Sequence, residues 1–304
     1  MDKASYFIRD KAMFGSYPDK ECVSILEQAG VRVFVNLTFD NEKKIIPYQT
    51  KYRRISFPIP DREIPTDVKA FSSFIINLSN ILRTDLKKGE LMYIHCKGGH
   101  GRSGVVVACI ISYMFNMSPK DAIATTSACH NARVTMRQKW RNIGSPQTYL
   151  QKKFVHDLFK TVQFSRFGNS IYKDAFSNFS PYPLLVDGMG VFPTVQAALE
   201  AYKNPTDKNY VEKQINSKTP YISKKLGREV VLRDDWGQVR DSIFYKLVKT
   251  KFDQHPTIKQ VLMETGLGKI VQLNKTVNSD YDMVVLGDIL TTIRNEYYMT
   301  DEYL

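Results

Sequence analysis

The chain has 304 residues, 43% of them hydrophobic and 24% charged, with no apolar run of membrane-spanning length and no secretory-type apolar segment at its start. Its four cysteines show no paired spacing, so composition excludes the membrane-spanning and disulfide-rich classes and favours a two-domain cytoplasmic protein with free thiols and no membrane contact. The formal net charge of +12 belongs almost entirely to residues 1–160, which hold 25 Lys and Arg against 14 Asp and Glu, and this half would attract anionic substrates.

The first half alternates predicted strands with predicted helices. Buried strands, rich in β-branched and aromatic residues, are predicted at 31–38, 52–57 and 91–96. Helices are predicted at 66–89, with Thr66 or Asp67 as N-cap and Gly89 as stop, at 103–116, and at 118–130. This alternation predicts an α/β domain over residues 1–162, in which helices flank a central, mostly parallel sheet.

The stretch HCKGGHGRSG, residues 95–104, joins the third strand to the second helix. Its glycines allow the backbone amides to converge, and the N-terminus of the following helix adds unpaired donors, which makes a cradle for a phosphate dianion. Arg102, at the start of the helix, can bind two phosphate oxygens, and the same field favours the thiolate of Cys96. The loop therefore predicts nucleophilic catalysis of phosphoryl transfer.

This His-Cys-x5-Arg-Ser pattern resembles the signature of cysteine-based protein tyrosine phosphatases of the dual-specificity branch, over roughly residues 5–160. The resemblance implies that Cys96 forms a phosphocysteine, that Arg102 binds the phosphoryl oxygens and that Ser103 hydrogen-bonds the thiolate. The phosphate-binding positions are then Lys97, Gly98, Gly99, His100 and Gly101, and the loop is also similar to that of phosphoinositide phosphatases. The other cysteines, Cys22, Cys109 and Cys129, are expected to be inert residues of the core.

A leaving alkoxide or phenolate needs a proton, so a carboxylic acid must lie on a neighbouring loop. The proline-punctuated segment FPIPDREIPTD, residues 57–67, is the candidate. The family resemblance places its acid in this region, which assigns Asp61, with Glu63 in reserve. Asp67 is expected to cap the helix that follows.

A basic segment follows at residues 131–154, without an acidic residue and around Trp140. Its six cations are Arg133, Arg137, Lys139, Arg141, Lys152 and Lys153. It is either a docking surface for a polyanion, such as an RNA 5′ end, a nucleotide or a lipid head group, or a solvated helix face. Gln147 and Gln151 resemble the glutamines that some of these phosphatases place near the pocket.

The second half shows helical spacing at 193–204, 241–266 and 283–298, which predicts a mainly helical domain over residues 163–304. Its blocks FSNFSPYPLLVDG, FPTVQAALEAYK and LRDDWGQVRDSIFYKLVKTKFDQHP resemble, in order, those of the NADAR or YbiA-like family, which acts on N-glycosidic or ADP-ribose-linked substrates. The resemblance implies a ligand site at Asn178, Phe179, Gln196, Glu200, Trp236 and Lys251.

This half also departs from the family pattern. Many members have Glu-His where this chain has Gln196-Ala197, and Gln272 stands where the family has a glutamate. Glu200, one helical turn after Gln196, could supply a carboxylate from a shifted position, as could Asp280 and Asp282. We expect binding of an ADP-ribose-type ligand, with hydrolysis as the less favoured outcome, because glutamine cannot act as a general acid or base.

Together these features predict a phosphomonoester hydrolase fused to a module that binds or hydrolyses N-glycosidic substrates. The phosphatase substrate would be a phosphorylated protein or a nucleotide. An RNA 5′-phosphatase or triphosphatase is one alternative, and a non-catalytic module that binds phospho-ligands is another. No cofactor and no metal site is expected from the residue spacing.

Overall fold

A computed structural model describes residues 2–165, 170–273 and 282–300. The chain divides into two compact units. The first is formed mainly by the chain up to Lys160, and the second by Thr161–Thr265 and Lys269–Tyr297. Two short described segments, Gly266–Gly268 and residues 298–300, group with the first unit.

The first unit contains a five-stranded sheet in the order β1-β2-β5-β3-β4. Its strands are β1 (Ala4–Ile8), β2 (Ala12–Gly15), β3 (Val31–Asn36), β4 (Arg53–Ser56) and β5 (Leu91–His95). The β1–β2 pair is antiparallel and the other three pairs are parallel. The predicted mostly parallel sheet is therefore confirmed, with an N-terminal hairpin that the sequence analysis had not assigned.

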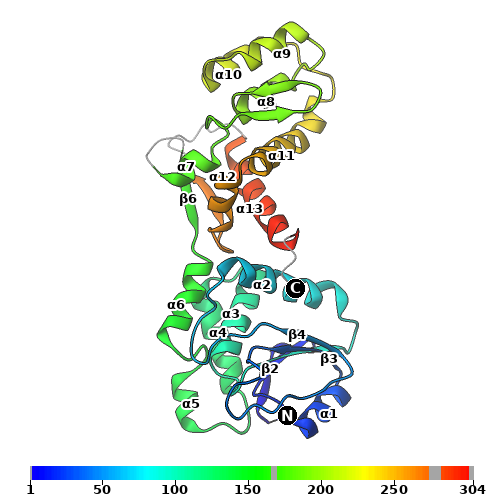
Figure 1. Cartoon of the computed structure of the whole chain (residues 1–304), viewed down its shortest axis with the longest axis vertical. Helices are drawn as coiled ribbons and strands as arrows, with labels where there is room; N and C mark the ends of the chain where they lie inside the picture. The colour runs from blue at the N-terminus through cyan, green and yellow to red at the C-terminus, as the bar shows by residue number, and fades with distance from the viewer. Residues whose placement is uncertain (1, 166–169, 274–281, 301–304) are drawn as a thin grey trace. The chain divides into compact units, whose positions relative to one another are not determined.

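Helices cover both faces of this sheet (Figure 1). They are α1 (Lys20–Gln28), α2 (Val68–Asn80), α3 (Arg102–Phe115), α4 (Pro119–Asn131), α5 (Gln138–Ile143) and α6 (Tyr149–Leu158), with a π-helical turn η1 (Ile81–Asp85) after α2. Helix α1 packs on the face that carries Met13, Phe34 and Tyr93, whereas α3 packs against β2 and β5. All five residues of β5 are buried because this central strand is covered on both sides.

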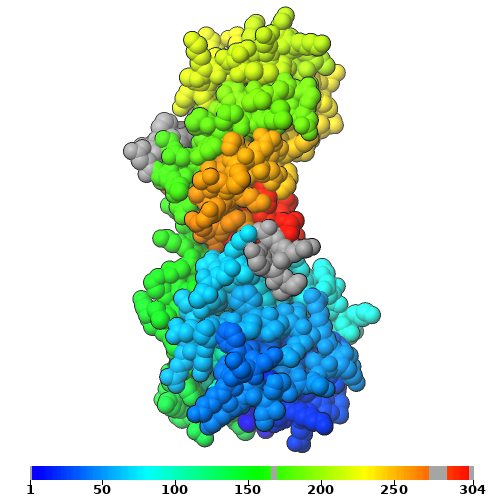
Figure 2. Space-filling model, in the orientation of Figure 1, coloured from blue at the N-terminus to red at the C-terminus, as the bar shows by residue number. Residues whose placement is uncertain are grey.

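The strand register brings four loops to one edge of the sheet. Gly15 and Asn36 both pair with His95, and Asn36 also pairs with Ser56. The four strands thus end side by side, and the segments that follow them start from a common edge, which is where open α/β sheets bind ligands. Segments that precede α2, in blue, cover much of the visible face of the first unit (Figure 2).

Helix boundaries follow the predicted caps. Asp67 is the N-cap of α2 and accepts a hydrogen bond from the backbone amide of Ala70 at 2.9 Å. Ser118 caps α4, with Pro119 at its first position. The helix predicted to continue to residue 89 instead ends at Asn80 and passes into η1. None of the helices in the described part of the chain is long and apolar enough to cross a membrane.

The second unit is mainly helical in its described residues, as predicted. Its helices are α7 (Ile171–Phe176), α8 (Val195–Ala201), α9 (Lys208–Ile215), α10 (Pro220–Glu229), α11 (Trp236–Gln254), α12 (Pro256–Met263) and α13 (Asp282–Thr300). Strands β6 (Val162–Ser165) and β9 (Ile270–Leu273) pair in parallel, and β7 (Leu184–Val186) and β8 (Gly190–Phe192) form an antiparallel hairpin. Every residue of α8 is buried, because α9, α10 and α11 all pack against it.

Candidate active site

The loop between β5 and α3 encloses the predicted nucleophile. Cys96 follows the last residue of β5, and its side chain is only 3% exposed. Its Sγ lies 3.5 Å from the Oγ of Ser103, which is fully buried in the first turn of α3. The structure therefore places the predicted thiol and hydroxyl within hydrogen-bonding distance at the N-terminus of a 14-residue helix.

Three carbonyl groups of this loop are held from outside the loop. The donor–acceptor pairs are Tyr17 N to Lys97 O at 3.1 Å, Arg133 Nη1 to Gly99 O at 2.7 Å, and Ser145 Oγ to His100 O at 2.6 Å. The C=O and N–H groups of a trans peptide point in opposite directions. Each anchored carbonyl thus turns the amide of the next residue toward the inside of the loop.

The backbone amides of the loop are the groups that the sequence predicts to form an anion cradle. No acceptor among the described residues receives a hydrogen bond from the backbone amides of residues 97–101. Gly99 has a φ of +72°, and a Cβ there would lie 2.4 Å from the backbone carbon of Gly15, so only glycine fits. This geometry leaves several N–H groups of the loop available to an anion, and the binding of phosphate there stays a prediction.

Arg102 is the central charged group of this site. It is 1% exposed and donates to both carboxylate oxygens of Glu42, at 2.7 and 3.0 Å. Its Nη2 also donates to Oδ1 of Asp61 at 2.9 Å, and its Nη1 donates to the carbonyl of Ile59 at 2.9 Å. One guanidinium thus links the start of α3 to the loops after β3 and β4.

Glu42 is a site residue that the sequence analysis missed. It lies six residues after the end of β3 in a segment without regular structure, so no periodic pattern marks it. Hydrogen bonds from Arg102 hold the pKa of its carboxyl below the ordinary value. The one available signal was its position after a buried parallel strand, where functional side chains gather.

The predicted acid lies on the loop after β4. The Asp61 side chain is 55% exposed and reaches Arg102 from the solvent side. Gln151 is fully buried and donates from Nε2 to the carbonyl of Glu63 at 3.1 Å, so α6 supports the same loop. Glu63, the reserve assignment, is itself exposed.

The side chains of Lys97 and His100, two of the predicted phosphate-binding positions, have partners within the protein. Lys97 donates to the carbonyl of Lys43 at 2.7 Å and lies 3.7 Å from Glu42. The His100 ring stacks on Trp140, with 4.6 Å between centroids, and its Nδ1 is 2.8 Å from the Nε2 of His130. Burial lowers the pKa of His100 to about 4, so this ring is neutral near neutral pH and serves packing.

His95, directly before the cysteine, is also neutral. Its Nε2 is 2.7 Å from the hydroxyl of Tyr48, and the rings of Tyr17, Tyr48 and Tyr93 surround it. Burial lowers the pKa of His95 to about 3. This residue anchors the end of β5.

The basic segment is only partly a surface feature. Arg133 is 3% exposed, and Arg141 donates to the carbonyl groups of Asn131 and Arg133. Arg137 and Lys139 remain exposed. The guanidinium groups of Arg133 and Arg141 are thus engaged with the backbone, and a polyanion docking surface on the other cations of the segment stays a prediction.

The remaining cysteines differ in their surroundings. Cys109 is fully buried in α3, and burial raises the pKa of its thiol. Cys129 is partly exposed. Cys22, expected in the core, is instead exposed on the first turn of α1, because only Val23 and Leu26 of that helix face the sheet.

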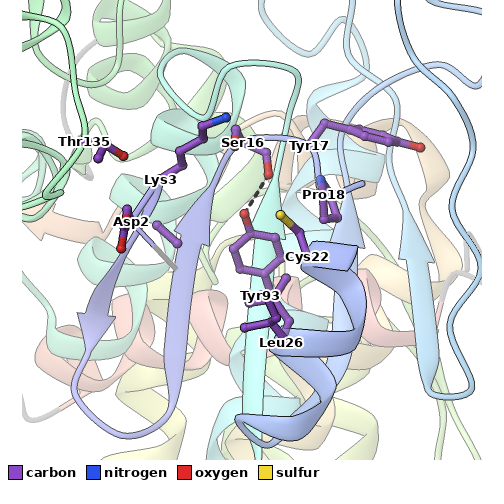
Figure 3. A pocket seen from close by; sticks show the side chains of 11 residues that line it. Asp2, Lys3, Ser16, Tyr17, Pro18, Cys22, Leu26, Tyr93 and Thr135 are labelled. Carbon is purple, nitrogen blue, oxygen red and sulfur yellow. Dashed lines mark hydrogen bonds between the residues drawn. The ribbon is translucent and has the colours of Figure 1, made fainter. Parts of the chain in front are cut away.

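Cys22 lines a cavity of about 400 Å³ together with Ser16, Tyr17 and Pro18 of the segment that follows β2 (Figure 3). The hydroxyl of Tyr93 donates to the carbonyl of Ser16 at 2.6 Å in its wall. That bond fixes the segment whose next residue, Tyr17, anchors the carbonyl of Lys97. The segment that forms part of the cavity wall therefore also holds the loop between β5 and α3.

In the second unit, three of the predicted ligand-site residues form a buried chain of hydrogen bonds. Asn178 donates to Oε1 of Gln196 at 2.6 Å, and Gln196 donates to Oε1 of Glu200 at 2.6 Å. Nζ of Lys203 lies 2.6 Å from Oε2 of Glu200. A Cβ at Gly227 would lie 1.7 Å from the same oxygen, so glycine is required for this close approach.

The other predicted residues of this unit are more dispersed. Lys251 is 1% exposed and donates to the carbonyls of Ala175 and Ser177, at 2.8 and 3.2 Å, directly before Asn178. Burial lowers the pKa of Lys251 to about 7. Trp236 lies fifteen positions earlier on α11, about 22 Å along the helix axis, so it is not brought to Lys251.

The remaining predicted positions of this unit divide into three cases. Phe179 contacts the ring of Tyr221 edge-on, with 5.4 Å between centroids. The Oε1 of Gln272 is buried without a hydrogen-bond donor from the described residues. Asp280 and the side chain of Asp282 lie outside the described part. Among the described residues no three His, Cys, Asp or Glu side chains gather to hold a metal ion.

Comparisons with known proteins separate the same two parts. Residues 5–155 match the family described as "Swiss Army Knife protein, DSP-PTPase phosphatase domain", and residues 166–279 match the NADAR domain. N-glycosidase YbiA of Escherichia coli is 31% identical over 99 residues, which are 32% of this chain and 61% of YbiA. The NMR structure of E. coli YbiA aligns at 24% identity with a TM-score of 0.41, covering 47% of this chain and 89% of YbiA.

One relative is similar along nearly its whole length. The protein named "Putative tyrosine phosphatase 197R" of Invertebrate iridescent virus 6 is 34% identical over 293 residues, which cover 95% of this chain and 89% of the viral protein. The chain therefore belongs to the tyrosine-phosphatase-like family with a DSP-PTPase domain, followed here by a NADAR domain.

Proposed function

We propose that the first unit hydrolyses phosphate monoesters, on a protein side chain or a nucleotide, through a phosphocysteine intermediate on Cys96. The observation that carries this proposal is the 2.9 Å hydrogen bond between Arg102 and Asp61. Through it, an acid from the loop after β4 meets the guanidinium that follows the nucleophile's loop. Nucleophile, anion cradle and proton donor are the three parts that phosphoryl transfer of this kind requires.

In the first step, the sulfur anion of Cys96 attacks phosphorus and the bond to the leaving oxygen breaks. The phosphoryl oxygens accept hydrogen bonds from the loop amides and from Arg102, which stabilises the transition-state charge. These oxygens take over the Nη2 donor that Asp61 occupies in the free enzyme. Asp61 is thereby released toward the leaving oxygen, to which it donates a proton.

In the second step, water attacks the phosphocysteine and Asp61 accepts the proton that the water loses. The P–S bond breaks, inorganic phosphate is released and the electron pair returns to sulfur. The Ser103 hydroxyl, 3.5 Å from that sulfur, can donate to the departing thiolate. Glu42, on the loop after β3, accepts hydrogen bonds from Arg102 at both carboxylate oxygens and so fixes the orientation of the planar guanidinium.

The acid assignment predicts a dependence on the leaving group. In Asp61→Asn we expect kcat to fall about 10²- to 10³-fold for alkyl phosphates, whose alkoxide needs a proton. For p-nitrophenyl phosphate, whose phenolate leaves without help, the loss should be under about tenfold. The measurement is kcat across a series of phosphate esters of rising leaving-group pKa.

Glu63→Gln is the matched control, because Glu63 lies two residues away on the same loop and is exposed. It should leave the whole series unchanged. A loss in Asp61→Asn that is equal for all leaving groups would remove Asp61 as the acid.

For the second unit, we infer that the buried chain from Asn178 to Lys203 supports a site for an ADP-ribose-type ligand. Similarity to an N-glycosidase points to this ligand class, and the carboxylate of Glu200 is held by both Gln196 and Lys203. Binding is favoured over hydrolysis because the two family glutamates stand here as Gln196 and Gln272.

Glu200→Gln tests this site by calorimetric titration of ADP-ribose. The substitution leaves the ammonium of Lys203 without its counter-charge, and we expect about a tenfold loss of affinity. Glu212→Gln, an exposed acid on α9, should bind as the unchanged chain does. Mass spectrometry of NAD and of ADP-ribosylated DNA after incubation detects any cleavage. No binding and no product from the unchanged chain would exclude the ligand class.

A further inference from the structure

Arg133 is a buried cation without a buried anion. Its guanidinium donates to the Gly99 carbonyl at 2.7 Å, to the Phe14 carbonyl at 3.1 Å and to the Ser5 hydroxyl at 3.3 Å. Its guanidinium carbon lies 4.4 Å from the centre of the Phe14 ring. All four contacts are with neutral groups, and Arg133 forms no ion pair with any residue that the structure describes. An arginine 3% exposed normally has a carboxylate partner.

The titratable groups that face Arg133 among the described residues include no carboxylate either. They are Tyr93, Cys96, His100 and His130. Burial lowers the pKa of Arg133 to about 10 and lowers those of both histidines to about 4, so Arg133 is charged and the histidines are neutral near neutral pH. Of these four groups, only Cys96 would supply negative charge, through its sulfur anion. A phosphoryl group attached to that sulfur would supply further negative charge.

The contact with Gly99 also sets a peptide direction. The amide of His100 belongs to the same peptide unit as the Gly99 carbonyl, and it points the opposite way. Arg133 is one of three anchors of the loop carbonyls, and the other two, Tyr17 N and Ser145 Oγ, are neutral.

We propose that Arg133 is a positioning residue of the phosphatase site: it fixes the Gly99–His100 peptide so that its amide faces the phosphoryl group, and it places a second buried positive charge behind the loop. This inference rests on the proposed function and adds to it a residue 34 positions from the loop it supports. The positive charge of Arg133 would favour the anionic state of Cys96. The planar guanidinium, by holding the Gly99 carbonyl, would keep the His100 amide in place for the bound phosphate.

Two substitutions separate these effects. Arg133→Met removes both charge and fork. We expect kcat/KM on p-nitrophenyl phosphate to fall about 10²-fold, the size of losing one oxyanion donor, and the acid limb of its pH profile to move upward. Arg133→Lys keeps the charge but cannot span three acceptors, so we expect the wild-type acid limb with an affinity for inorganic phosphate about tenfold weaker.

Arg137→Met is the matched control, because it removes the same charge from an exposed position of the same segment. Wild-type phosphate affinity and pH profile in Arg133→Met would overturn the proposal. If Arg133→Met does not fold, Arg133→Lys decides alone: unchanged phosphate affinity there overturns it, and a tenfold loss with an unmoved acid limb supports it.

The binding measurement also separates this inference from the proposed function. An unchanged chain that binds inorganic phosphate without turning over aryl phosphates would refute the hydrolase. A loss of phosphate affinity in Arg133→Met would still support the positioning role. Full turnover in Arg133→Met would refute the positioning role alone.

Discussion

Replacing the sulfur of Cys96 by oxygen in Cys96→Ser should abolish turnover of p-nitrophenyl phosphate, with a loss of kcat on the order of 10⁵ or more, as for other enzymes deprived of their nucleophile. Neither nearby histidine can remove the proton of a serine hydroxyl at this position, because the rings of His95 and His100 are buried and hydrogen bonded to Tyr48 and His130. The fold should persist, because the substitution changes one atom. The measurement is kcat together with the unfolding temperature.

Phosphate binding should survive the same substitution. The amides of residues 97–101 and the guanidinium of Arg102 remain, so the affinity of Cys96→Ser for inorganic phosphate should stay within about tenfold of the unchanged chain. Cys22→Ser is the control, because this cysteine is exposed and lines a different cavity. Retained turnover in Cys96→Ser would contradict the phosphocysteine mechanism. If the unchanged chain also bound phosphate without turnover, the non-catalytic alternative would be favoured.

The parts of the fold that sequence predicts are those fixed by local chemistry. Strands β3 and β5 are mostly apolar because helices cover both faces of the sheet. Helix α4 starts at Ser118 and Pro119, a local N-cap pattern that the sequence alone identifies. The β1–β2 hairpin was missed, because β2 has only four residues and its place is fixed by pairing with β5, about 80 positions away.

The site divides in the same way. Cys96, Ser103 and Arg102 lie within eight consecutive residues, so one strand-loop-helix unit brings them together and the sequence shows it. Glu42 and Arg133 reach the site across 60 and 34 positions. Glu42 approaches from an irregular segment, and Arg133 stood among five other cations of the same segment. Apart from the place of Glu42 after a buried strand, only the tertiary contacts distinguish these two residues from ordinary surface charges.

In the second unit, helical spacing placed Gln196 and Glu200 on the same face of one predicted helix. Gln196 and Glu200 are four positions apart on α8, and their side chains are hydrogen bonded at 2.6 Å. Trp236 and Lys251 were grouped by family resemblance alone. Both belong to one aligned block, and their separation along α11 shows that two positions of such a block need not lie close together.

The second large effect is expected at Arg102, where Arg102→Lys should lower kcat/KM about 10³-fold although the charge is kept. A lysine ammonium cannot donate in one plane to both oxygens of Glu42, to the carbonyl of Ile59 and to Asp61, as the guanidinium does. It would pair with Glu42, the nearer and more buried carboxylate, and leave the phosphoryl oxygens with the loop amides alone. Steady-state kinetics on p-nitrophenyl phosphate measures the loss.

Two controls isolate the geometry of this group. Arg9→Lys exchanges the same side chains at a position 94% exposed and should change nothing. Glu42→Gln keeps the acceptor but removes the charge that orients Arg102, so we expect about a tenfold loss in kcat/KM, smaller than that of Arg102→Lys. If Arg102→Lys kept more than about a tenth of wild-type kcat/KM, a positive charge at this position would suffice for catalysis without the planar guanidinium. The planar fork between α3 and the loops after β3 and β4 would then be structural, because catalysis would not depend on it.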